Sequence, residues 1–255
     1  MVGHGKMDRC GQAHRRRESV NAAARESLED WALSIAPAAP GAAVLDLGCG
    51  TGKLAIPYAH AVGPTGNVLG VDISPGSIAE LQTKAKREGL TNVAARAGNL
   101  DEIANESFDK PFDLIVSSYA IYYATDMPGL LRALAAKLTA DGRVFVCGPG
   151  EGTNREMDEL LRRAAPDVEP PEPLADFISL EQIGEASSAY RKLETYRLAN
   201  AVRFEDAEAL LSWWRNHNMY LEAADQAVER ALREHFAARG EFTLTKNVLG
   251  VLFCR

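Results

Sequence analysis

The sequence predicts an α/β fold with a parallel sheet, on the basis of three observations. Five short apolar runs between residues 43 and 147 alternate with stretches of helical periodicity, and this alternation is typical of parallel strands joined by right-handed crossovers. Glycines follow the first apolar run directly, where a strand must turn into a helix. The 255-residue chain is 46% hydrophobic and 25% charged, which is the composition of an ordinary globular protein.

The first 35 residues divide into two parts. Residues 1–16 mix glycine, histidine and basic residues without apolar periodicity, so we expect disorder there. Over residues 17–35, apolar residues recur every three or four positions and predict a helix, which Pro37 and then Pro40 end. We expect residues 17–255 to form a single domain.

Strands and helices then alternate up to residue 147. Apolar runs predict strands at residues 43–47, 67–71, 92–97, 112–116 and 143–147. Helical periodicity predicts helices at residues 53–61, 74–88 and 127–138. The second helix has plain start and stop signals, because Ser74 can cap it, Pro75 suits its first turn, and Gly89 ends it.

After residue 150 the pattern is looser. Four prolines between Pro166 and Pro173 exclude regular structure in that segment. Helices are predicted at residues 151–164, 206–216 and 223–238. Long extended patterns predict strands at residues 194–204 and 241–253.

The composition limits the partners and the compartment. A formal net charge of −7 disfavours nucleic acid as a substrate. No apolar run reaches the ~18 residues of a membrane span, and no signal-peptide core begins the chain, so we expect a cytoplasmic protein without a membrane segment. No Cys-x-x-Cys pair occurs, and no cysteine has a histidine at ligand spacing. We therefore expect no metal site, and reduced thiols at Cys10, Cys49, Cys147 and Cys254.

The segment from Val44 to Gly52, Val-Leu-Asp-Leu-Gly-Cys-Gly-Thr-Gly, carries the strongest chemical signal. Glycines at alternate positions let the backbone turn under a flat ligand that side chains would block. The spacing differs from the Gly-x-Gly-x-x-Gly pattern of pyrophosphate sites, which argues against a nicotinamide dinucleotide. Asp46 suits a cationic amino-acid tail better than a phosphate. Asp72, after the next strand, is placed to accept hydrogen bonds from ribose hydroxyls.

This segment resembles the first motif of the class I S-adenosylmethionine-dependent methyltransferases, and the resemblance continues to about residue 150. Gly70–Ser74 is similar to the second motif, and Phe112–Ser118 to the fourth strand. Ala97–Leu100 looks like the adenine-binding turn, although the family more often has aspartate where this chain has Asn99. The resemblance implies S-adenosylmethionine as the cofactor, held by Asp46, Gly48, Cys49, Gly50, Gly52, Asp72, Ile73, Asn99, Leu100 and Ser117.

The resemblance also implies a fold. This is a Rossmann-like, mostly parallel sheet of seven strands with helices on both faces and the last strand antiparallel. Residues 40–150 would form the cofactor-binding half, and residues 151–240 would include a substrate-side or lid excursion.

Several family motifs are missing, and their absence narrows the acceptor. After the fourth predicted strand the chain has Ser117-Ser118-Tyr119-Ala120, not the Asn/Asp-Pro-Pro-aromatic motif of nucleic-acid amino methylation. The acidic cluster of metal-dependent catechol enzymes is missing there, and arsenite enzymes need cysteines, of which only Cys49 lies near the site. We therefore expect methyl transfer to oxygen, nitrogen or carbon of a small organic acceptor, with secondary metabolism as a hypothesis.

Three alternatives stay open at this level. The acceptor could be a protein or an RNA, although the acidic balance speaks against both. The chain could bind the cofactor without catalysis, or it could use the sulfonium for other chemistry. The sequence indicates no oligomeric state.

The candidate catalytic residues are Tyr119, Tyr122 and His217. The two tyrosines follow the fourth predicted strand and either form an aromatic wall against the sulfonium or the substrate, or simply pack. His217 is the best-placed histidine for a general base. Trp213 and Trp214 are adjacent, so they cannot both face the protein core from one helix. We therefore expect either that one of them lies at the surface or that this segment forms a lid over the pocket.

Overall fold

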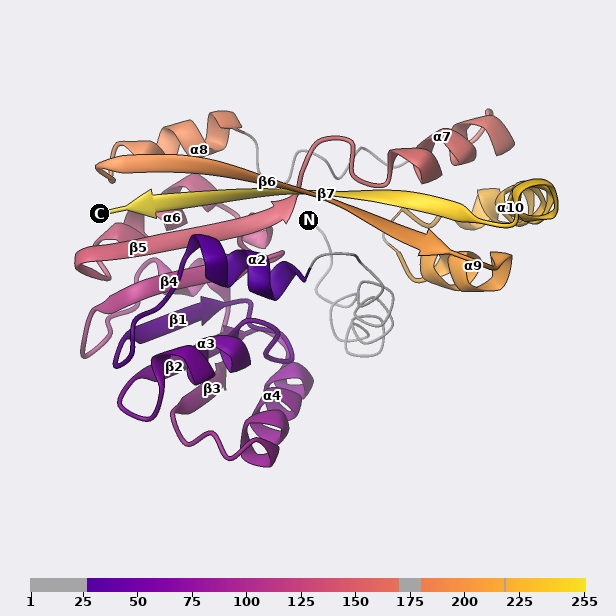
Figure 1. Ribbon diagram of the computed structural model, residues 1–255. Coiled ribbons are helices and arrows are strands. Elements are labelled where there is room, and N and C mark those ends of the chain that lie inside the picture. Colours follow the sequence, from indigo (N-terminus) through magenta and orange to yellow (C-terminus); the bar gives the residue numbers. More distant parts are fainter. Residues whose placement is uncertain (1–26, 170–179, 218) are drawn as a thin grey trace. The chain divides into compact units, whose positions relative to one another are not determined.

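A seven-stranded sheet organises the chain in the computed structural model, which describes residues 27–169, 180–217 and 219–255 (Figure 1). The strand order is β3-β2-β1-β4-β5-β7-β6. The strands are β1 (Ala43–Leu47), β2 (Asn67–Asp72), β3 (Val93–Ala97), β4 (Phe112–Ser118), β5 (Leu138–Pro149), β6 (Lys192–Phe204) and β7 (Phe242–Cys254). The expected disorder of residues 1–16 and the first part of the predicted N-terminal helix lie outside the described residues.

Helices connect most of the strands. The α-helices are α2 (Leu28–Ile35), α3 (Ala55–Val62), α4 (Pro75–Arg87), α5 (Leu100–Ile103), α6 (Met127–Ala135), α7 (Arg155–Ala164), α8 (Leu180–Ser187), α9 (Ala207–Arg215) and α10 (Asp225–Arg239). Two short 3₁₀ helices are η2 (Ile121–Tyr123) and η4 (Glu222–Ala224). Helices α2, α3 and α4 lie on one face of the sheet, and α6 and α8 pack together on the other (Figure 1).

The predicted fold class is confirmed. β1 pairs in parallel with both β2 and β4, and β2 with β3 and β4 with β5 are parallel as well. The last strand, β7, runs opposite to β5 beside it (Figure 1). Because β1 is flanked by parallel strands, Val44, Leu45 and Leu47 are fully buried, as a continuous apolar run predicts.

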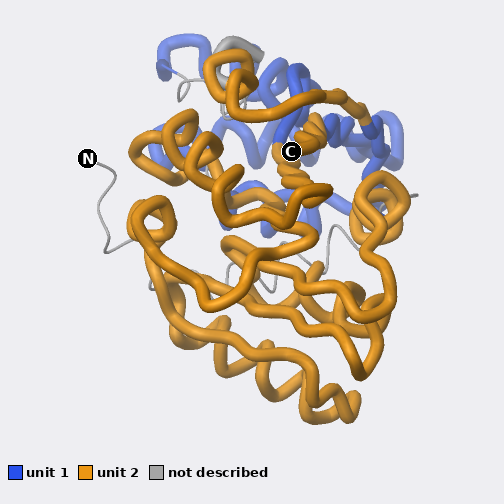
Figure 2. The backbone as a smooth tube through the Cα atoms, turned by 90° about the vertical axis from the view of Figure 1, so that its left-hand side faces the viewer, with its two compact units in different colours: residues 1–27, 149–176, 198–248 blue, residues 28–148, 177–197, 249–255 orange. Residues whose placement is uncertain are grey.

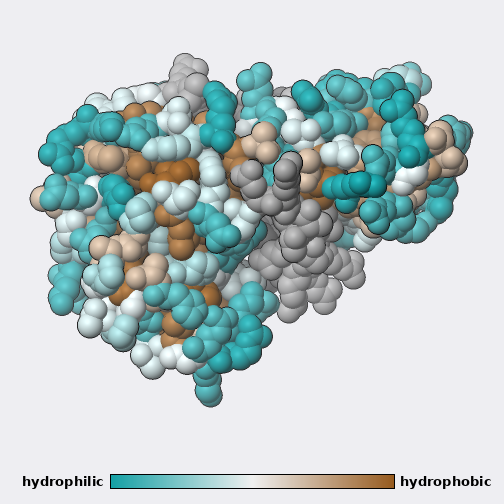
Figure 3. Space-filling model, viewed as in Figure 1, coloured by the Kyte–Doolittle hydropathy of each residue, from teal (hydrophilic) through white to brown (hydrophobic). Residues whose placement is uncertain are grey.

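Helix α4 forms where its sequence signals predict. The Ser74 hydroxyl accepts a hydrogen bond from the Ser77 amide at 3.3 Å, and Pro75 occupies the first turn. Gly89 follows the helix with a φ of +69°. Its buried residues, among them Ile78 and Leu81, belong to a helix that packs on β2 and β3. The residues over α4 in Figure 3 are mostly hydrophilic, so the helix is amphipathic as expected.

Two predicted helices are wrong in extent, and two short helices were missed. The helix expected to reach Leu138 ends at Ala135, because the next residues join β5 and the Phe112 amide bonds the Lys137 carbonyl at 2.9 Å. The helix expected from residue 151 begins only at Arg155, because Gly152 and Asn154 adopt left-handed backbone conformations. The short helices α5 and α8 were not predicted at all.

Two compact units divide the described chain, and each has its own core (Figure 2). Residues 28–148, 177–197 and 249–255 form the larger unit. Residues 149–176 and 198–248 belong to the smaller unit, whose core gathers side chains of α7, α9 and α10 with those of β6 and β7. The single domain expected from residue 17 to 255 stays a prediction.

In the smaller unit, α9 buries two faces. Trp213 is 4% exposed and Trp214 is fully buried, so the expectation that one of them lies at the surface is wrong. The reason is non-local: Trp213 contacts Phe204 of β6, whereas the loop after the helix folds back and places Tyr220 edge-on against Trp214, with ring centroids 5.0 Å apart. A helix covered on two sides can bury adjacent residues.

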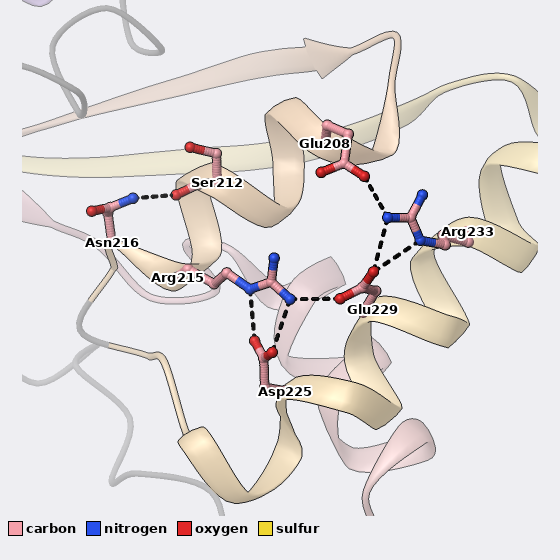
Figure 4. A network of polar contacts seen from close by, with 7 residues as sticks. All are labelled: Glu208, Ser212, Arg215, Asn216, Asp225, Glu229 and Arg233. Carbon is pink, nitrogen blue, oxygen red and sulfur yellow. Dashed lines mark hydrogen bonds and ion pairs between the residues drawn. The ribbon is translucent and has the colours of Figure 1, made fainter.

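Charged side chains join α9 to α10 (Figure 4). Arg215 forms a two-pronged ion pair with Asp225, with both N–O distances 2.8 Å, and also reaches Glu229 at 2.6 Å. Arg233 bonds Glu229 and Glu208 in turn. The network extends over both helices and should hold them in register.

Candidate functional site

The candidate site lies where the strand order reverses. β1 has β2 on one side and β4 on the other, so the connections leave in opposite directions at the carboxyl ends of these strands. In open α/β sheets this position leaves a crevice for ligands. The glycine-rich segment follows β1, Asp72 ends β2, and Ser117 and Tyr119 lie at the end of β4.

The three motif glycines all have positive φ, but they differ in what surrounds them. A Cβ at Gly48 would lie 2.0 Å from the Ala120 Cβ, and one at Gly52 would lie 2.4 Å from Leu81 Cδ1. A Cβ at Gly50 would meet nothing within 4 Å. Gly48 and Gly52 are therefore required by packing, whereas Gly50 borders open space in which a ligand could lie.

Asp72 holds the loop from the neighbouring strand. Its Oδ2 accepts a hydrogen bond from the Gly50 amide at 2.8 Å, and its Oδ1 accepts one from the Ser74 amide at 2.9 Å. A carboxylate oxygen can accept two hydrogen bonds, so both oxygens keep capacity for a further donor. The half-buried side chain is thus fixed in place beside Gly50.

Asp46 is a buried carboxylate with incomplete hydrogen bonding. It is 2% exposed, and among the described residues its Oδ2 atom has no hydrogen-bond partner. Burial, and then the nearby Asp72 carboxylate, raise the pKa of Asp46 to about 7, although the Ala55 amide donates a hydrogen bond to it. An unpaired buried oxygen is costly, and it marks a place where a donor would bind.

The end of β4 is tied to the end of β1. The buried Ser117 hydroxyl donates to the Leu47 carbonyl at 2.8 Å, so this side chain holds the two strands together. Tyr119 follows with a φ of +56° and is 38% exposed, while its amide donates to the Cys147 carbonyl at 2.8 Å. Left-handed backbone is unfavourable for a tyrosine and is found most often at functional sites.

The next two tyrosines behave differently from one another. Tyr122 is half-buried and packs against the core of the larger unit. Tyr123 is 55% exposed, and its ring centroid lies 4.7 Å from that of Tyr122. Burial raises the pKa of the Tyr122 phenol well above its usual range, so this group is neutral at physiological pH.

The remaining cofactor candidates surround the ends of β1, β2 and β3. Cys49 is 4% exposed and lies against Gly70, where a Cβ would be 2.8 Å from its Sγ atom. Ile73 is 40% exposed, a large exposure for an isoleucine. Asn99 caps α5 by accepting from the Asp101 amide at 3.1 Å, and Leu100 packs against the core.

Sequence reasoning missed two contacts that shape this region. Ala120 is the small residue against which Gly48 packs. Asp101 accepts hydrogen bonds from the amide and the hydroxyl of Thr125 at 2.7 and 2.9 Å, and so joins the turn after β3 to the segment before α6. Both depend on contacts distant in sequence; the only local signal was the small residue directly after Tyr119.

His217 lies in the smaller unit, whereas the other candidates lie in the larger one. Its ring stacks on Trp213 with centroids 4.5 Å apart, and its Nδ1 atom accepts from the Met219 amide at 3.2 Å. Nε2 is therefore the nitrogen that carries the proton in the neutral ring. Its role as a general base stays a prediction.

Residues 27–169, 180–217 and 219–255 hold neither a cluster of metal ligands nor a helix that could span a membrane. No group of three or more histidine, cysteine, aspartate or glutamate side chains there could hold a metal ion. None of the helices in those ranges has the length and apolarity needed to cross a membrane.

The arrangement matches a known family. A family model described as a methyltransferase domain matches residues 38–200, which is well over half of the chain. The chain belongs to this methyltransferase domain family. The match includes the glycine loop, Asp72 and the end of β4, so the resemblance noted in the sequence is confirmed.

Individual relatives match a shorter part. The chain is 33% identical over 117 residues to the aklanonic acid methyltransferase DauC of Streptomyces sp. strain C5, covering 46% of this chain and 52% of that protein. It is 33% identical over 118 residues to the nocamycin O-methyltransferase of Saccharothrix syringae, covering 46% and 41%. The matches thus span about half the length of these curated relatives or less.

A solved structure extends the fold match to nearly the whole chain. Phosphoethanolamine N-methyltransferase 2 of Haemonchus contortus, in complex with S-adenosylhomocysteine, superposes with a TM-score of 0.58 at 17% identity, covering 97% of this chain and 58% of that one. At this identity the likeness concerns the fold, which is the Rossmann-like methyltransferase architecture expected from the sequence.

Proposed function

We propose that this chain transfers the methyl group of S-adenosylmethionine to a small organic acceptor. The observation that carries the proposal is the set of features at the carboxyl ends of β1 and β2. These are the open position at Gly50, the unpaired buried oxygen of Asp46, and the Asp72 carboxylate beside the loop. Membership of the methyltransferase domain family supports it.

The residues present fit this cofactor. The space at Gly50 leaves room for a flat nucleoside over the loop. Asp46 would accept a hydrogen bond from the ammonium group of the amino-acid tail, which supplies the donor that Oδ2 lacks. Asp72 would use its remaining acceptor capacity for the ribose hydroxyls.

The other candidates have more modest roles in the proposal. Ile73, which is exposed, would cover one face of the adenine, with Leu100 and the turn at Asn99 beside it. Ser117 would act through its tie to Leu47, which holds the ends of β1 and β4 together. Gly48, Cys49 and Gly52 would shape the loop by close packing.

Catalysis would depend mainly on positioning. The bound cofactor supplies an electrophilic methyl group on a positively charged sulfur. Tyr119, held in a left-handed conformation at the end of β4, would present its ring to that charge or to the acceptor. Tyr122 is neutral and would act as a hydrogen-bonding group and not as a base. His217 is the proposed general base where the acceptor must lose a proton, and its Nδ1 atom would have to release the Met219 amide to take that proton.

The acceptor class follows from the relatives and the charge. The two curated relatives are named for aklanonic acid and for nocamycin, which supports a small organic acceptor. The net charge of −7 disfavours nucleic acid. A protein or RNA acceptor, and cofactor binding without catalysis, are the alternatives, and turnover with small acceptors would separate them from the proposal.

Calorimetric titration of the purified protein with S-adenosylhomocysteine tests the proposal, with NADH as the control ligand. We expect micromolar binding of the first and none of the second. Binding of NADH, or no binding of S-adenosylhomocysteine with or without candidate acceptors, would contradict it. Positive binding then justifies a screen of small phenols, acids and amines for a mass increase of one methyl group.

A further inference from the structure

We propose that cofactor binding releases a proton from Asp46, so that this buried carboxyl senses the charged amino-acid tail of the ligand. The inference rests on the proposed function, because it takes an S-adenosylmethionine-type ligand as the occupant of the site. It goes further in assigning a protonation change to one named residue. It also predicts which part of the ligand causes that change.

The strand register isolates the Asp46 side chain from polar partners. Asp46 lies in register with Gly70 on β2 and with Val116 on β4, and neither neighbour has a polar side chain. Its side chain is 2% exposed, so bulk water does not solvate the charge. In the described chain, Oδ2 has no hydrogen-bond partner. A carboxyl group in such a place is held more easily in its neutral form.

The titratable groups around Asp46 add no positive charge. Four groups interact electrostatically with Asp46: Asp72 from β2, Tyr58 from α3, Cys49 from the glycine loop and Cys147 from β5. Lys53, whose charge acts on Cys147, is itself paired with Glu29 at 3.3 Å. Burial raises the pKa of Tyr58 and of both thiols above their usual ranges, so these three are neutral near pH 7. Asp72 contributes a negative charge. Burial and the Asp72 charge thus both raise the pKa of Asp46, to about 7.

A bound ammonium group would reverse this balance. It brings a positive charge and hydrogen-bond donors to the buried oxygen, which favours the carboxylate. The proton then leaves the Asp46 carboxyl and is taken up by the buffer. The expected release is close to one proton per ligand where the pH is well below 7, and it falls toward zero as the pH rises above 7. At pH 6 the ligand's own amino group is already charged and contributes nothing.

Calorimetry in pairs of buffers measures this release directly. At each pH, S-adenosylhomocysteine is titrated in phosphate and in a buffer of high ionisation enthalpy, and the difference in heat gives the number of protons exchanged. The ligand control is 5′-methylthioadenosine, which has the nucleoside and sulfur but lacks the amino-acid tail. We expect it to bind more weakly and to release no proton at pH 6.

Two variants assign the proton to its residue. Asp46→Asn keeps the shape and one acceptor but cannot ionise, and we expect it to lose proton release at pH 6. Asp113→Asn is the matched control, because Asp113 is a partly buried aspartate that bonds Ala43 and Thr139 outside the candidate site. It should release the same number of protons as the parent.

The outcomes separate the inference from the proposed function. Binding of S-adenosylhomocysteine without proton release at pH 6, equal release with 5′-methylthioadenosine, or undiminished release in Asp46→Asn would each overturn the inference alone. No binding of either ligand would overturn the proposed function together with it. The comparison of the two ligands uses the parent protein, so it decides the question even where a variant fails to fold.

Discussion

The loops of the candidate site and the α9–α10 pair differ in whether their carboxylates have partners. At the carboxyl ends of β1 and β4, Gly50 and Tyr119 have left-handed backbone, and a buried carboxylate oxygen of Asp46 has no partner. In the helix pair, each carboxylate of the network meets an arginine (Figure 4). Two residues with left-handed backbone and an unpaired carboxylate oxygen thus lie together where a ligand is proposed to bind, whereas the atom of α9 that is buried without a hydrogen-bond partner among the described residues, Trp214 Nε1, belongs to an uncharged side chain.

This difference suggests where substitutions will affect binding and where they will affect only folding. In the site loops, the exposed or unpaired groups should matter for ligand affinity. In the helix pair, the paired charges should matter for stability and for nothing else.

Substitution within the glycine loop gives the largest expected effect. Gly50→Val would fill the open space at the loop, so we expect binding of S-adenosylhomocysteine to fall by at least about 1000-fold by steric block. The left-handed φ of +51° makes the change strained by about 1–2 kcal/mol, which a folded chain should survive. Calorimetry and thermal melting measure the two consequences.

Gly48→Ala provides the contrast within the same loop. Its Cβ would lie 2.0 Å from that of Ala120. We therefore expect a large loss of thermal stability in the protein without ligand. Full affinity in Gly50→Val would remove the loop from the binding site. A Gly48→Ala protein as stable as the parent would show that the loop and the end of β4 are not packed as described.

Removal of the Asp72 carboxylate has the next largest effect. Asp72→Ala should weaken S-adenosylhomocysteine binding by about 100-fold or more, since hydrogen bonds to a charged group are each worth about 1.5–3 kcal/mol. Part of the loss would come from the loop itself, because Gly50 and Ser74 lose their acceptor. Asp72→Asn keeps one acceptor for the backbone and should bind with intermediate affinity. Equal affinity in all three proteins would exclude Asp72 from the site.

The sequence predicted the glycine loop well because its requirements are local. The alternate glycines, the preceding strand and the acid after the next strand can all be recognised from the order of residues alone. Ser74 and Gly89 mark the ends of α4 in the same way. The unpaired oxygen of Asp46 was not visible, because it depends on which residues of β2 and β4 lie in register with it.

The structure of the second half of the chain was harder to predict from the sequence, because it depends on contacts between distant residues. One of the adjacent residues Trp213 and Trp214 was expected at the surface, yet both are buried, because residues after α9 fold back over the helix. Helix α8 is only eight residues long and has Gly184 in its interior. Because glycine has a low helix propensity and the segment is short, its sequence does not clearly predict a helix. The family match covers residues 38–200, so it includes α8 but ends before α9.

The ionisation of Asp46 should also appear in the stability of the protein without ligand. Its pKa rises in the fold from 3.8 to about 7, so between those values the native chain binds more protons than the unfolded chain. The stability that this residue contributes is therefore fully present below pH 3.8 and is lost as the pH rises through 7. Asp46→Asn, which cannot ionise, should escape this loss.

We expect the melting temperature of Asp46→Asn relative to the parent to rise by several degrees between pH 5 and pH 8. Each pH unit of unequal proton binding is worth about 1.4 kcal/mol, and 1 kcal/mol shifts the melting temperature by about 2–4 °C. Melting curves at four pH values measure it, and Asp113→Asn is the control. Parallel profiles for Asp46→Asn and the parent would show that the carboxyl ionises normally in the fold.

The smallest expected effect lies in the helix pair. Arg215→Met removes the two-pronged pair with Asp225 and the bond to Glu229 at once, and should lower the melting temperature by about 2–3 °C. Arg162→Met removes a single surface pair with Asp158 and should change it by less than about 1 °C. Because salt screens exposed charges, the difference between the two variants should shrink in 1 M NaCl. Neither should alter affinity for S-adenosylhomocysteine; a tenfold loss in Arg215→Met would mean that the helix pair takes part in binding and that the comparison is too simple.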